Sequence, residues 1–252
     1  MGNDGFKNEN LMLESLNNKK FSELNDNLQQ MIVYMADNAI LPNTLIKAYK
    51  IGGKEKTDLI VEIDNQPFNI SIKKGMGNSV HQEKVEDFID FLEKEFDITK
   101  DLANDIRFFI WCDGTIDGSG KLSDRVGASQ FKKKYPKITN NLRQFFHNNK
   151  RKLIERFVIK GPRTNLFPDF IYYGTPNKGF IIKSKNAINW LCEDNMESKK
   201  AAVPVGRLTF QPWNPVINGN PKREHCRGQI QLKWSSICKD LILINEYAKN
   251  KK

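Results

Sequence analysis

Apolar and polar positions in the first third of the chain predict a helix followed by three strands. The strand-like runs are residues 44–51, 58–63 and 68–73, and the turn sequence DNQP separates the last two. The helix ends before Pro42 and has an apolar stripe at three- and four-residue spacing, made of Phe21, Leu24, Leu28, Met31, Met35 and Ala39. A shorter apolar face, made of Phe6, Leu13 and Leu16, predicts another helix near the N-terminus.

The middle of the chain alternates helical and strand-like patterns. Ser79 and Gln82 form a capping-box pattern, which predicts that a long amphipathic helix begins there. Its apolar face would be Val85, Phe88, Ile89, Leu92 and Phe96. Residues 106–112 have the continuous apolar run of a buried strand, and basic helices are expected at 123–134 and after Pro136.

From about residue 156 the pattern changes to short strands, at 169–174, 179–184, 206–210 and 227–234. The shift predicts two lobes, residues 1–155 and 156–252. The net charge is +10 and the isoelectric point is about 9.3, which favours binding to nucleic acid over an unspecialised basic surface.

The cysteine count and the apolar runs exclude two broad classes of protein. Four cysteines in 252 residues are no disulfide framework, so a reducing cytoplasm is expected. The N-terminus has no signal-peptide pattern, and the apolar runs are too short to cross a membrane.

The predicted hairpin carries an acid at one end and a lysine at the other. If strands 58–63 and 68–73 pair, Asp58 and Lys73 meet near one end of the ladder, and Ser71 shares the strand face of Lys73. An acid and a lysine so placed can hold a divalent metal ion and orient a water that attacks a phosphate. A cross-strand salt bridge at the surface has the same pattern.

Two residues on the predicted flanking helices are further candidates for this site. Glu9 falls in the middle of the apolar face of the N-terminal helix, where an unpaired carboxylate is uncommon. Gln82 leans toward the apolar face of its helix, whereas Glu83 falls near the opposite, solvent-facing side. Gln82 is therefore the better candidate to reach the site, although a capping role explains it equally well.

One ordered set of residues resembles the PD-(D/E)XK nuclease superfamily: Glu9, Asp58, Ser71-Ile72-Lys73 and Gln82. The segments GFKNE, KTDLIVEI and NISIKKG look like small type II restriction endonucleases of the MspI and HhaI kind, and FPDFIYYG and GQIQLKW extend the likeness into the second half. The resemblance implies an α/β fold with a mixed central β-sheet flanked by helices and a β-rich, DNA-recognising C-terminal lobe. It also implies that Asp58 binds Mg²⁺, that Lys73 positions the attacking water, and that Glu9 and Gln82 support the site.

Two departures from the superfamily pattern affect this reading. Ser71 stands where the pattern has a second metal-binding acid, so we expect Ser71 to act through a water and the Ile72 carbonyl to supply another ligand. Asp169 and Lys183 form a second Asp–Lys pattern, without a polar residue at its middle position. We interpret it as a hairpin of the recognition lobe, so Asp169→Ala should leave cleavage largely intact.

The C-terminal strands carry side chains suited to base recognition, because Arg and Lys pair well with guanine and Gln with adenine. Alternate positions place such groups on one face of each strand: Arg207 and Gln211, then Arg227, Gln229, Gln231 and Lys233. An ordinary solvent-facing strand alternates in the same way. Basic helices at 123–134 and 148–156 suit phosphate contacts or a plain solvated surface.

These features predict a Mg²⁺-dependent type II restriction endonuclease that cuts double-stranded DNA. The resemblance implies a palindromic site of about four base pairs, a monomer that cuts one strand at a time, and a cognate DNA methyltransferase in the same genome. Two alternatives remain open. One is a nucleic-acid-binding module that has lost catalysis, marked by Ser71, and the other is a structure-selective repair nuclease of the same fold.

Overall fold

The computed structural model describes residues 3–53, 55–75, 79–162, 165–193, 201–213 and 221–249. Its contacts divide the chain into two compact units. The first unit comprises residues 1–78, 158–190 and 236–252, and the second comprises residues 79–157 and 191–235. The units alternate along the chain, unlike the predicted single division at residue 155. Residues 79–155, expected in the catalytic core, belong to the second unit, and residues 158–190 and 236–252, expected in the recognition lobe, belong to the first.

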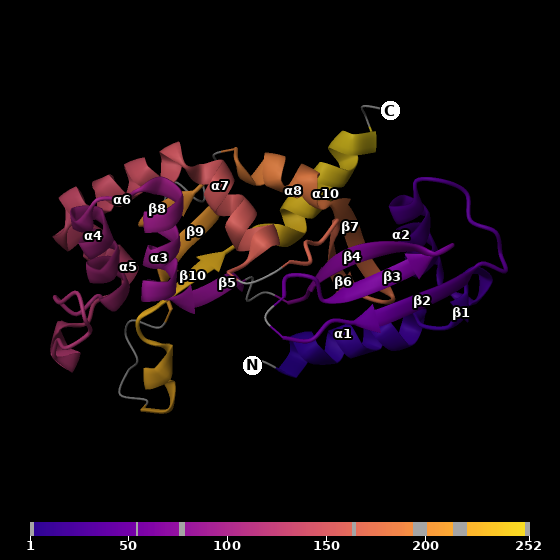
Figure 1. Cartoon of the computed structure of the whole chain (residues 1–252), viewed down its shortest axis with the longest axis horizontal. Coiled ribbons are helices and arrows are strands. Elements are labelled where there is room, and N and C mark those ends of the chain that lie inside the picture. Colours follow the sequence, from indigo (N-terminus) through magenta and orange to yellow (C-terminus); the bar gives the residue numbers. More distant parts are fainter. Residues whose placement is uncertain are drawn as a thin grey trace. The chain divides into compact units, whose positions relative to one another are not determined.

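A six-stranded mixed sheet, with the strand order β1-β2-β3-β4-β6-β7, forms the first unit (Figure 1). The strands are β1 (Lys19–Lys20), β2 (Leu45–Lys50), β3 (Leu59–Ile63), β4 (Gln66–Lys73), β6 (Phe170–Thr175) and β7 (Lys178–Lys183). Neighbouring strands are antiparallel except β4 and β6, which are parallel. The helices of this unit are α1 (Asn3–Leu16), η1 (Phe21–Glu23), α2 (Asp26–Ala36), α8 (Ser184–Leu191) and α10 (Ile237–Lys249), and the π-helix η3 (Arg156–Lys160) lies at the crossing.

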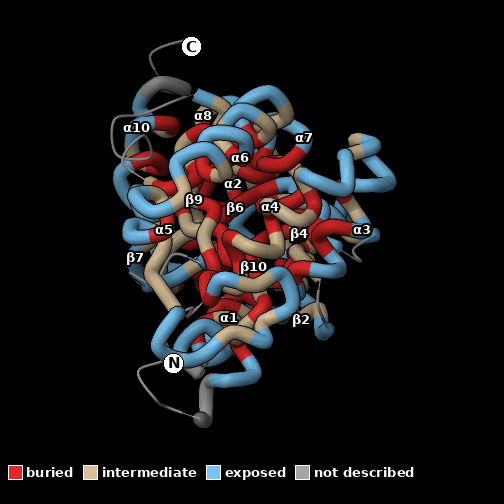
Figure 2. Tube along the Cα trace, turned by 90° about the vertical axis from the view of Figure 1, so that its left-hand side faces the viewer, coloured by how far each residue is buried: buried red, intermediate tan, exposed pale blue. Residues whose placement is uncertain are grey.

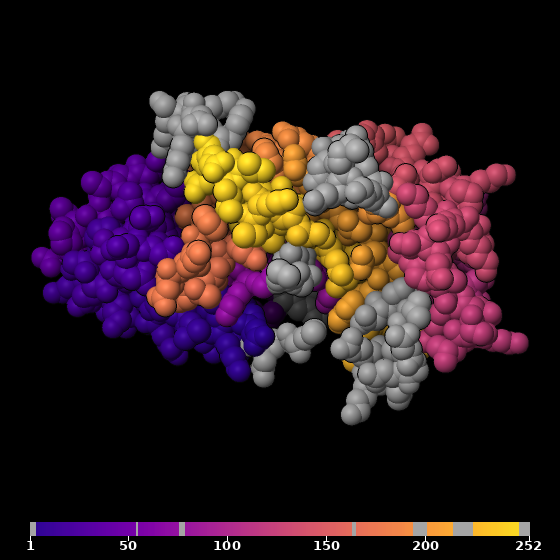
Figure 3. Space-filling view, turned by 180° about the vertical axis from the view of Figure 1, so that it is seen from behind, coloured from indigo at the N-terminus to yellow at the C-terminus, as the bar shows by residue number. Residues whose placement is uncertain are grey.

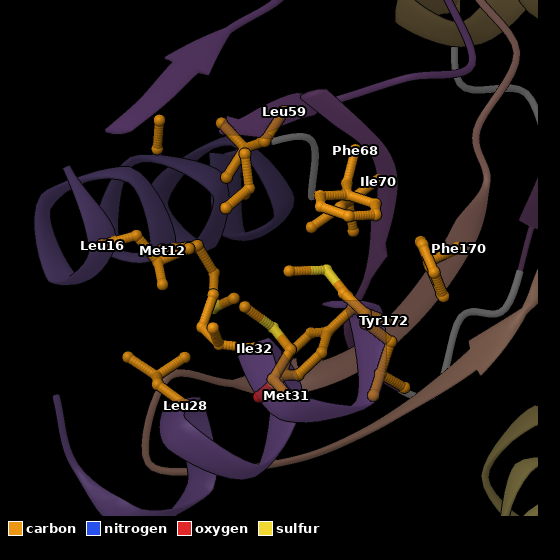
Figure 4. Packing of buried hydrophobic residues seen from close by; sticks show 14 of the residues in the cluster. Met12, Leu16, Leu28, Met31, Ile32, Leu59, Phe68, Ile70, Phe170 and Tyr172 are labelled. Atoms are coloured by element: carbon orange, nitrogen blue, oxygen red, sulfur yellow. The ribbon is translucent and has the colours of Figure 1, made fainter. Parts of the chain in front are cut away.

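The core of the first unit forms where α1 and α2 bury their apolar faces against one face of this sheet (Figure 4). Leu28, Met31 and Met35 of the predicted stripe are buried on α2, but Phe21 lies in η1 and Ala39 lies beyond the helix and is exposed. The helix starts at Asn25, whose side chain accepts from the Leu28 N–H at 3.0 Å. Alternate residues of β3 and β4 supply the other half of the cluster. Ile171 is buried on the opposite sheet face, and α10 lies beside β7 (Figure 3).

The second unit has an antiparallel sheet in the order β5-β10-β9-β8, covered on one face by helices (Figure 1). Its strands are β5 (Ser79–Lys84), β8 (Val203–Val205), β9 (Leu208–Pro212) and β10 (Gln229–Lys233). Its helices are α3 (Val85–Phe96), α4 (Lys100–Trp111), η2 (Leu122–Asp124), α5 (Ala128–Lys134), α6 (Pro136–Asn148), α7 (Lys150–Glu155) and η4 (Pro221–Cys226). Figure 2 shows buried positions within both strands and helices. The core of the second unit is rich in buried aromatic side chains: Phe88, Phe109, Phe146, Phe157 and Phe210.

Two predicted elements of this unit are wrong. Residues 79–84 are a strand rather than a helix N-terminus, because β5 pairs with the distant strand β10 along its whole length. Residues 106–112 belong mostly to helix α4, which begins at an N-cap, Thr99. Its buried positions are Ala103, Ile106, Phe109 and Ile110, so the apolar run is one part of a helical stripe. A short run cannot distinguish these two periods.

The predicted fold class is confirmed, since a mixed central sheet is flanked by helices. The second unit also contains a sheet, but it is built from residues 79–157 and 191–235 rather than from the C-terminal part of the chain alone. None of the described helices is long and apolar enough to cross a membrane.

Candidate active site

Asp58, Ser71 and Lys73 meet at one end of the first sheet, as the predicted hairpin pairing requires. Asp58 directly precedes β3, whose residue Leu59 pairs with Ile70 of β4. Oδ2 of Asp58 accepts hydrogen bonds from Ser71 Oγ at 3.2 Å, the Ile72 N–H at 2.5 Å and Lys73 Nζ at 3.2 Å. One carboxylate oxygen therefore gathers three donors from three consecutive residues of the neighbouring strand.

The Asp58–Lys73 pair is half-buried rather than a fully exposed surface salt bridge, with side-chain exposures of 19% and 28%. Lys73 Nζ also donates to the Ile72 carbonyl at 3.1 Å. Ser71 is buried, and the Ile72 side chain points away into the core cluster of α1 and α2. The Lys73 ammonium thus lies between the Asp58 carboxylate and the Ile72 carbonyl, the two groups that were predicted from the sequence to bind a metal ion.

Glu9 is close in the fold to this sheet end, but it does not occupy the centre of an apolar face. The buried face of α1 contains Met12 and Leu16, whereas Phe6 is 54% exposed. Glu9 forms a salt bridge with Lys50 at 3.1 Å, and Lys50 is the last residue of β2. The prediction about the stripe is wrong because the register of buried positions 8, 12 and 16 places Glu9 at its edge.

The salt bridge nevertheless ties Glu9 to the segment beside Asp58. Lys50 pairs with Leu59 across β2 and β3, and the next residue, Ile51, donates its N–H to the Asp58 carbonyl at 3.0 Å. Lys50 Nζ also donates to Asn10 Oδ1 at 2.7 Å. Glu9 is therefore a neighbour of the strand end that carries Asp58.

Gln82 lies on strand β5 in the second unit, not on a helix of the first. It is exposed and pairs with Gln231 of β10. Its predicted capping role is wrong because residues 79–84 are extended. Its predicted part in the catalytic set stays a prediction.

The oxygen atoms around Asp58 are better ligands for a hard cation such as Mg²⁺ than for zinc. A carboxylate, the Ser71 hydroxyl and the Ile72 carbonyl are all oxygen ligands, and Mg²⁺ commonly uses one or two carboxylates and keeps several waters. Across the residues that the structure describes, no group of three or more His, Cys, Asp or Glu side chains forms a metal site. The oxygens that these contacts bring together are the Asp58 carboxylate and the neutral oxygens of Ser71 and Ile72.

The second Asp–Lys pattern does not form an acid–lysine pair. The Asp169 carboxylate accepts the Asn69 N–H at 2.9 Å, and Lys183 forms a salt bridge with Asp37 at 3.5 Å. The hairpin β6–β7 extends the sheet of the first unit, beside β4. Its assignment to a separate recognition lobe is therefore wrong, while its exclusion from the Asp58 site agrees with these contacts.

Four of the predicted DNA-contacting residues share one face of the second sheet. Gln211 and Gln231 are cross-strand partners, and Gln211 Nε2 donates to Gln231 Oε1 at 2.9 Å. Gln229 and Lys233 lie two residues to either side of Gln231 on β10, so their side chains are on the same face. Gln229 and Lys233 are half-buried, but Gln231 between them is buried, so the solvent-facing alternation predicted along β10 is interrupted at Gln231.

The two predicted arginines are held by acids instead. Arg227 has a side-chain exposure of only 6% and forms salt bridges with Asp113 at 2.7 Å and Glu224 at 3.0 Å. It precedes β10, and Gly228, with φ of +65°, turns the backbone between them, so the strand alternation does not extend to Arg227. Arg207 also precedes its strand and lies 3.4 Å from Glu193.

Sequence reasoning missed a buried ionic cluster formed by His81, Glu83 and Arg156. Arg156 bonds Glu83 Oε2 at 2.7 Å and its guanidinium lies 3.8 Å from the centre of the Phe91 ring. His81 Nε2 lies 2.8 Å from Glu83 Oε1. Burial opposes ionisation, but bonds and charges from His81 and Arg156 outweigh it, so the pKa of Glu83 is below its usual value. The signal was the alternation of His81 and Glu83 once residues 79–84 are taken as a strand.

Neither a protein-family model nor a curated protein sequence matches this chain. Among solved structures, the chain is similar to restriction endonuclease MspI in complex with its cognate DNA, with a TM-score of 0.57 and 14% sequence identity. The similarity covers 91% of this chain and 88% of that chain. At this identity the likeness establishes a restriction-endonuclease-like fold.

Proposed function

We propose that this protein is a Mg²⁺-dependent type II restriction endonuclease, which hydrolyses phosphodiester bonds in double-stranded DNA. The observation that carries the proposal is the convergence of Ser71, Ile72 and Lys73 on the Asp58 carboxylate, at the end of a sheet with a restriction-endonuclease-like fold. The net charge of +10 supports a polyanionic substrate.

Each residue of this site has a distinct task. The Asp58 carboxylate, the Ser71 hydroxyl, acting through a water, and the Ile72 carbonyl would hold Mg²⁺, which when bound supplies Lewis-acid polarisation of the phosphate and a more acidic water. The Lys73 ammonium, held 3.2 Å from Asp58, orients the attacking water and offsets the negative charge that develops on the phosphate. Glu9, paired with Lys50, supports the site.

The polar face of the second sheet is the proposed base-reading surface. Gln211, Gln229 and Lys233 are half-buried and carry amide and ammonium groups of the kind that read base edges in the major groove, whereas Gln231 is buried beneath them and bonds Gln211. We further propose a palindromic site of about four base pairs, cutting by a monomer, action in the cytoplasm, and a cognate methyltransferase that protects the host DNA. The four cysteines are free, which agrees with a reducing compartment.

One observation favours a second candidate, a DNA-binding module without catalysis. Ser71 replaces the second acid, and the described residues around Asp58 bring no other carboxylate into a metal cluster. Such a module would keep the base-reading surface and bind DNA, but it would not cut.

Cleavage of a sequenced plasmid in Mg²⁺ tests the proposal, with wild type beside Lys73→Ala. Lys183→Ala is the matched control, because Lys183 belongs to the other Asp–Lys pattern and pairs with Asp37. We expect discrete fragments from wild type and the control, and a rate lower by about 100-fold or more in Lys73→Ala. Tight DNA binding without cleavage by any of the three proteins would support the inactive module. Cleavage confined to branched DNA would identify a repair nuclease.

A further inference from the structure

On the side facing β3, the last three residues of β4, which include Lys73, are held by the side chain of Asp58. Backbone pairing between β3 and β4 extends to Leu59 and Ile70, and the Asp58 N–H bonds the Ile70 carbonyl at 2.8 Å. Beyond that point the Ile72 N–H donates to the Asp58 side chain rather than to a backbone carbonyl. The carboxylate that we assign to the metal therefore also holds the strand that presents Lys73.

Support on the other side comes from β6, through Tyr173. The parallel register pairs Ile72 with Tyr172 and Lys73 with Tyr173. Ile72 and Tyr172 both belong to the core cluster, so Lys73 and Tyr173 lie side by side on the opposite sheet face. Tyr173 is half-buried, and its hydroxyl donates to the Gly75 carbonyl at 3.2 Å. Gly75 has φ of +85°, so this bond holds the turn at which the chain leaves β4.

Tyr173 is itself well fixed. The carbonyl of the next residue, Gly174, accepts from Asn8 Nδ2 at 2.8 Å, and Asn8 is fully buried on α1. Gly174 has φ of +131°, and a Cβ there would lie 2.3 Å from the Lys178 carbonyl oxygen, so only glycine fits. Burial, with a smaller contribution from Cys238, raises the pKa of Tyr173. Its phenol therefore remains a hydrogen-bond donor at neutral pH.

We infer that Tyr173 is a positioning residue that keeps the end of β4, and with it Lys73, in place when the Asp58 carboxylate binds a metal ion. The inference rests on the proposed function. A carboxylate oxygen engaged by a cation has fewer lone pairs for the Ile72 N–H and for Lys73. Residues 71–73 then depend on β6 and on the bond from Tyr173 to Gly75. Small displacements of a group that orients a reactant can cost much of the rate.

Tyr173→Phe tests this role, because it removes the hydroxyl and keeps the ring. The matched control is Tyr49→Phe, since Tyr49 lies on β2 of the same unit and is 47% exposed. We expect kcat for Tyr173→Phe to fall by between about 5-fold and 100-fold, with KM changed by less than about twofold because the binding contacts are untouched. Tyr49→Phe should match wild type in both constants. In the presence of Mg²⁺, amide hydrogen exchange of a peptide covering residues 71–75 should be faster in Tyr173→Phe than in Tyr49→Phe.

Two results would overturn the inference. Unchanged kcat and unchanged hydrogen exchange in Tyr173→Phe would show that the bond from the Tyr173 hydroxyl to Gly75 does not position the end of β4. A loss of similar size when Tyr173→Phe is added to Lys73→Ala would show that Tyr173 acts independently of Lys73. A wild-type protein that cuts no DNA would refute the proposed function, whereas a cutting wild type with an equally active Tyr173→Phe refutes only the role of Tyr173.

Discussion

The buried cluster of Glu83, Arg156 and His81 allows a stability prediction that does not depend on the proposed function. In Glu83→Ala, Arg156 keeps its charge but loses both of its bonds to the carboxylate, while its side chain is only 9% exposed. Breaking a buried ion pair by removing one partner typically costs about 3–5 kcal/mol. Arg156 still stacks on Phe91 and reaches some solvent, so we expect the lower end, about 3 kcal/mol.

Thermal unfolding at pH 7, followed by circular dichroism, measures this cost. A loss of about 3 kcal/mol corresponds to a midpoint lower by about 6–12 °C for a chain of this size. Glu95→Ala is the matched control, because its pair with Lys152 is exposed at 40% and 57% and should contribute less than about 1 kcal/mol. Replacing both partners, Glu83→Leu with Arg156→Met, should recover most of the loss, since no unpaired charge then remains.

The pH dependence has a definite sign. The pKa of Glu83 is lower in the folded protein than 4.5, the usual value for a glutamate, so its contribution to stability is complete above that value and is lost as the pH falls through the folded pKa. The midpoint difference between wild type and Glu83→Gln should therefore shrink below about pH 4.5. A midpoint for Glu83→Ala within about 2 °C of wild type at pH 7 would refute the reasoning, because it would mean that Arg156 is readily rehydrated.

Three further predictions follow from single contacts. Mg²⁺ should raise the thermal midpoint of the wild type but not of Asp58→Ala, which lacks the proposed ligand; an equal rise in both proteins would place the metal elsewhere. Arg227→Ala should lower the thermal midpoint clearly, because the Asp113 side chain, which is 0% exposed, loses its salt-bridge partner. Weaker DNA binding with an unchanged midpoint would instead indicate that Arg227 contacts DNA bases. Burial and the nearby Asp113 charge raise the pKa of Cys112 to about 12, so maleimide should label exposed Cys238 in the native protein at pH 8 and leave Cys112 unlabelled until unfolding.

The sequence by itself determined the site at Asp58, because the information needed there is local. Two apolar runs joined by a four-residue turn can pair in few registers, and the side-chain period of two then brings Asp58 to Lys73. The α2 helix was equally predictable, since its stripe is long and its Asn25 cap adjoins it. These elements depend on contacts between residues close in the chain.

Only the tertiary structure decided which residues that are far apart in the sequence pair with each other. β5 is a strand because β10 pairs with it, and that pairing turns Glu83 inward to Arg156 and leaves Gln82 exposed. The pattern of residues 79–84 does not indicate that β10 pairs with them. An acid such as Glu83 is expected at the surface unless a buried cation, here Arg156, compensates its charge. Arg227 was misplaced for the same reason, because the acids that bury it, Asp113 and Glu224, lie in a separate loop and a short helix. Long-range pairing and charge compensation are properties of the folded chain, and the local pattern does not contain them.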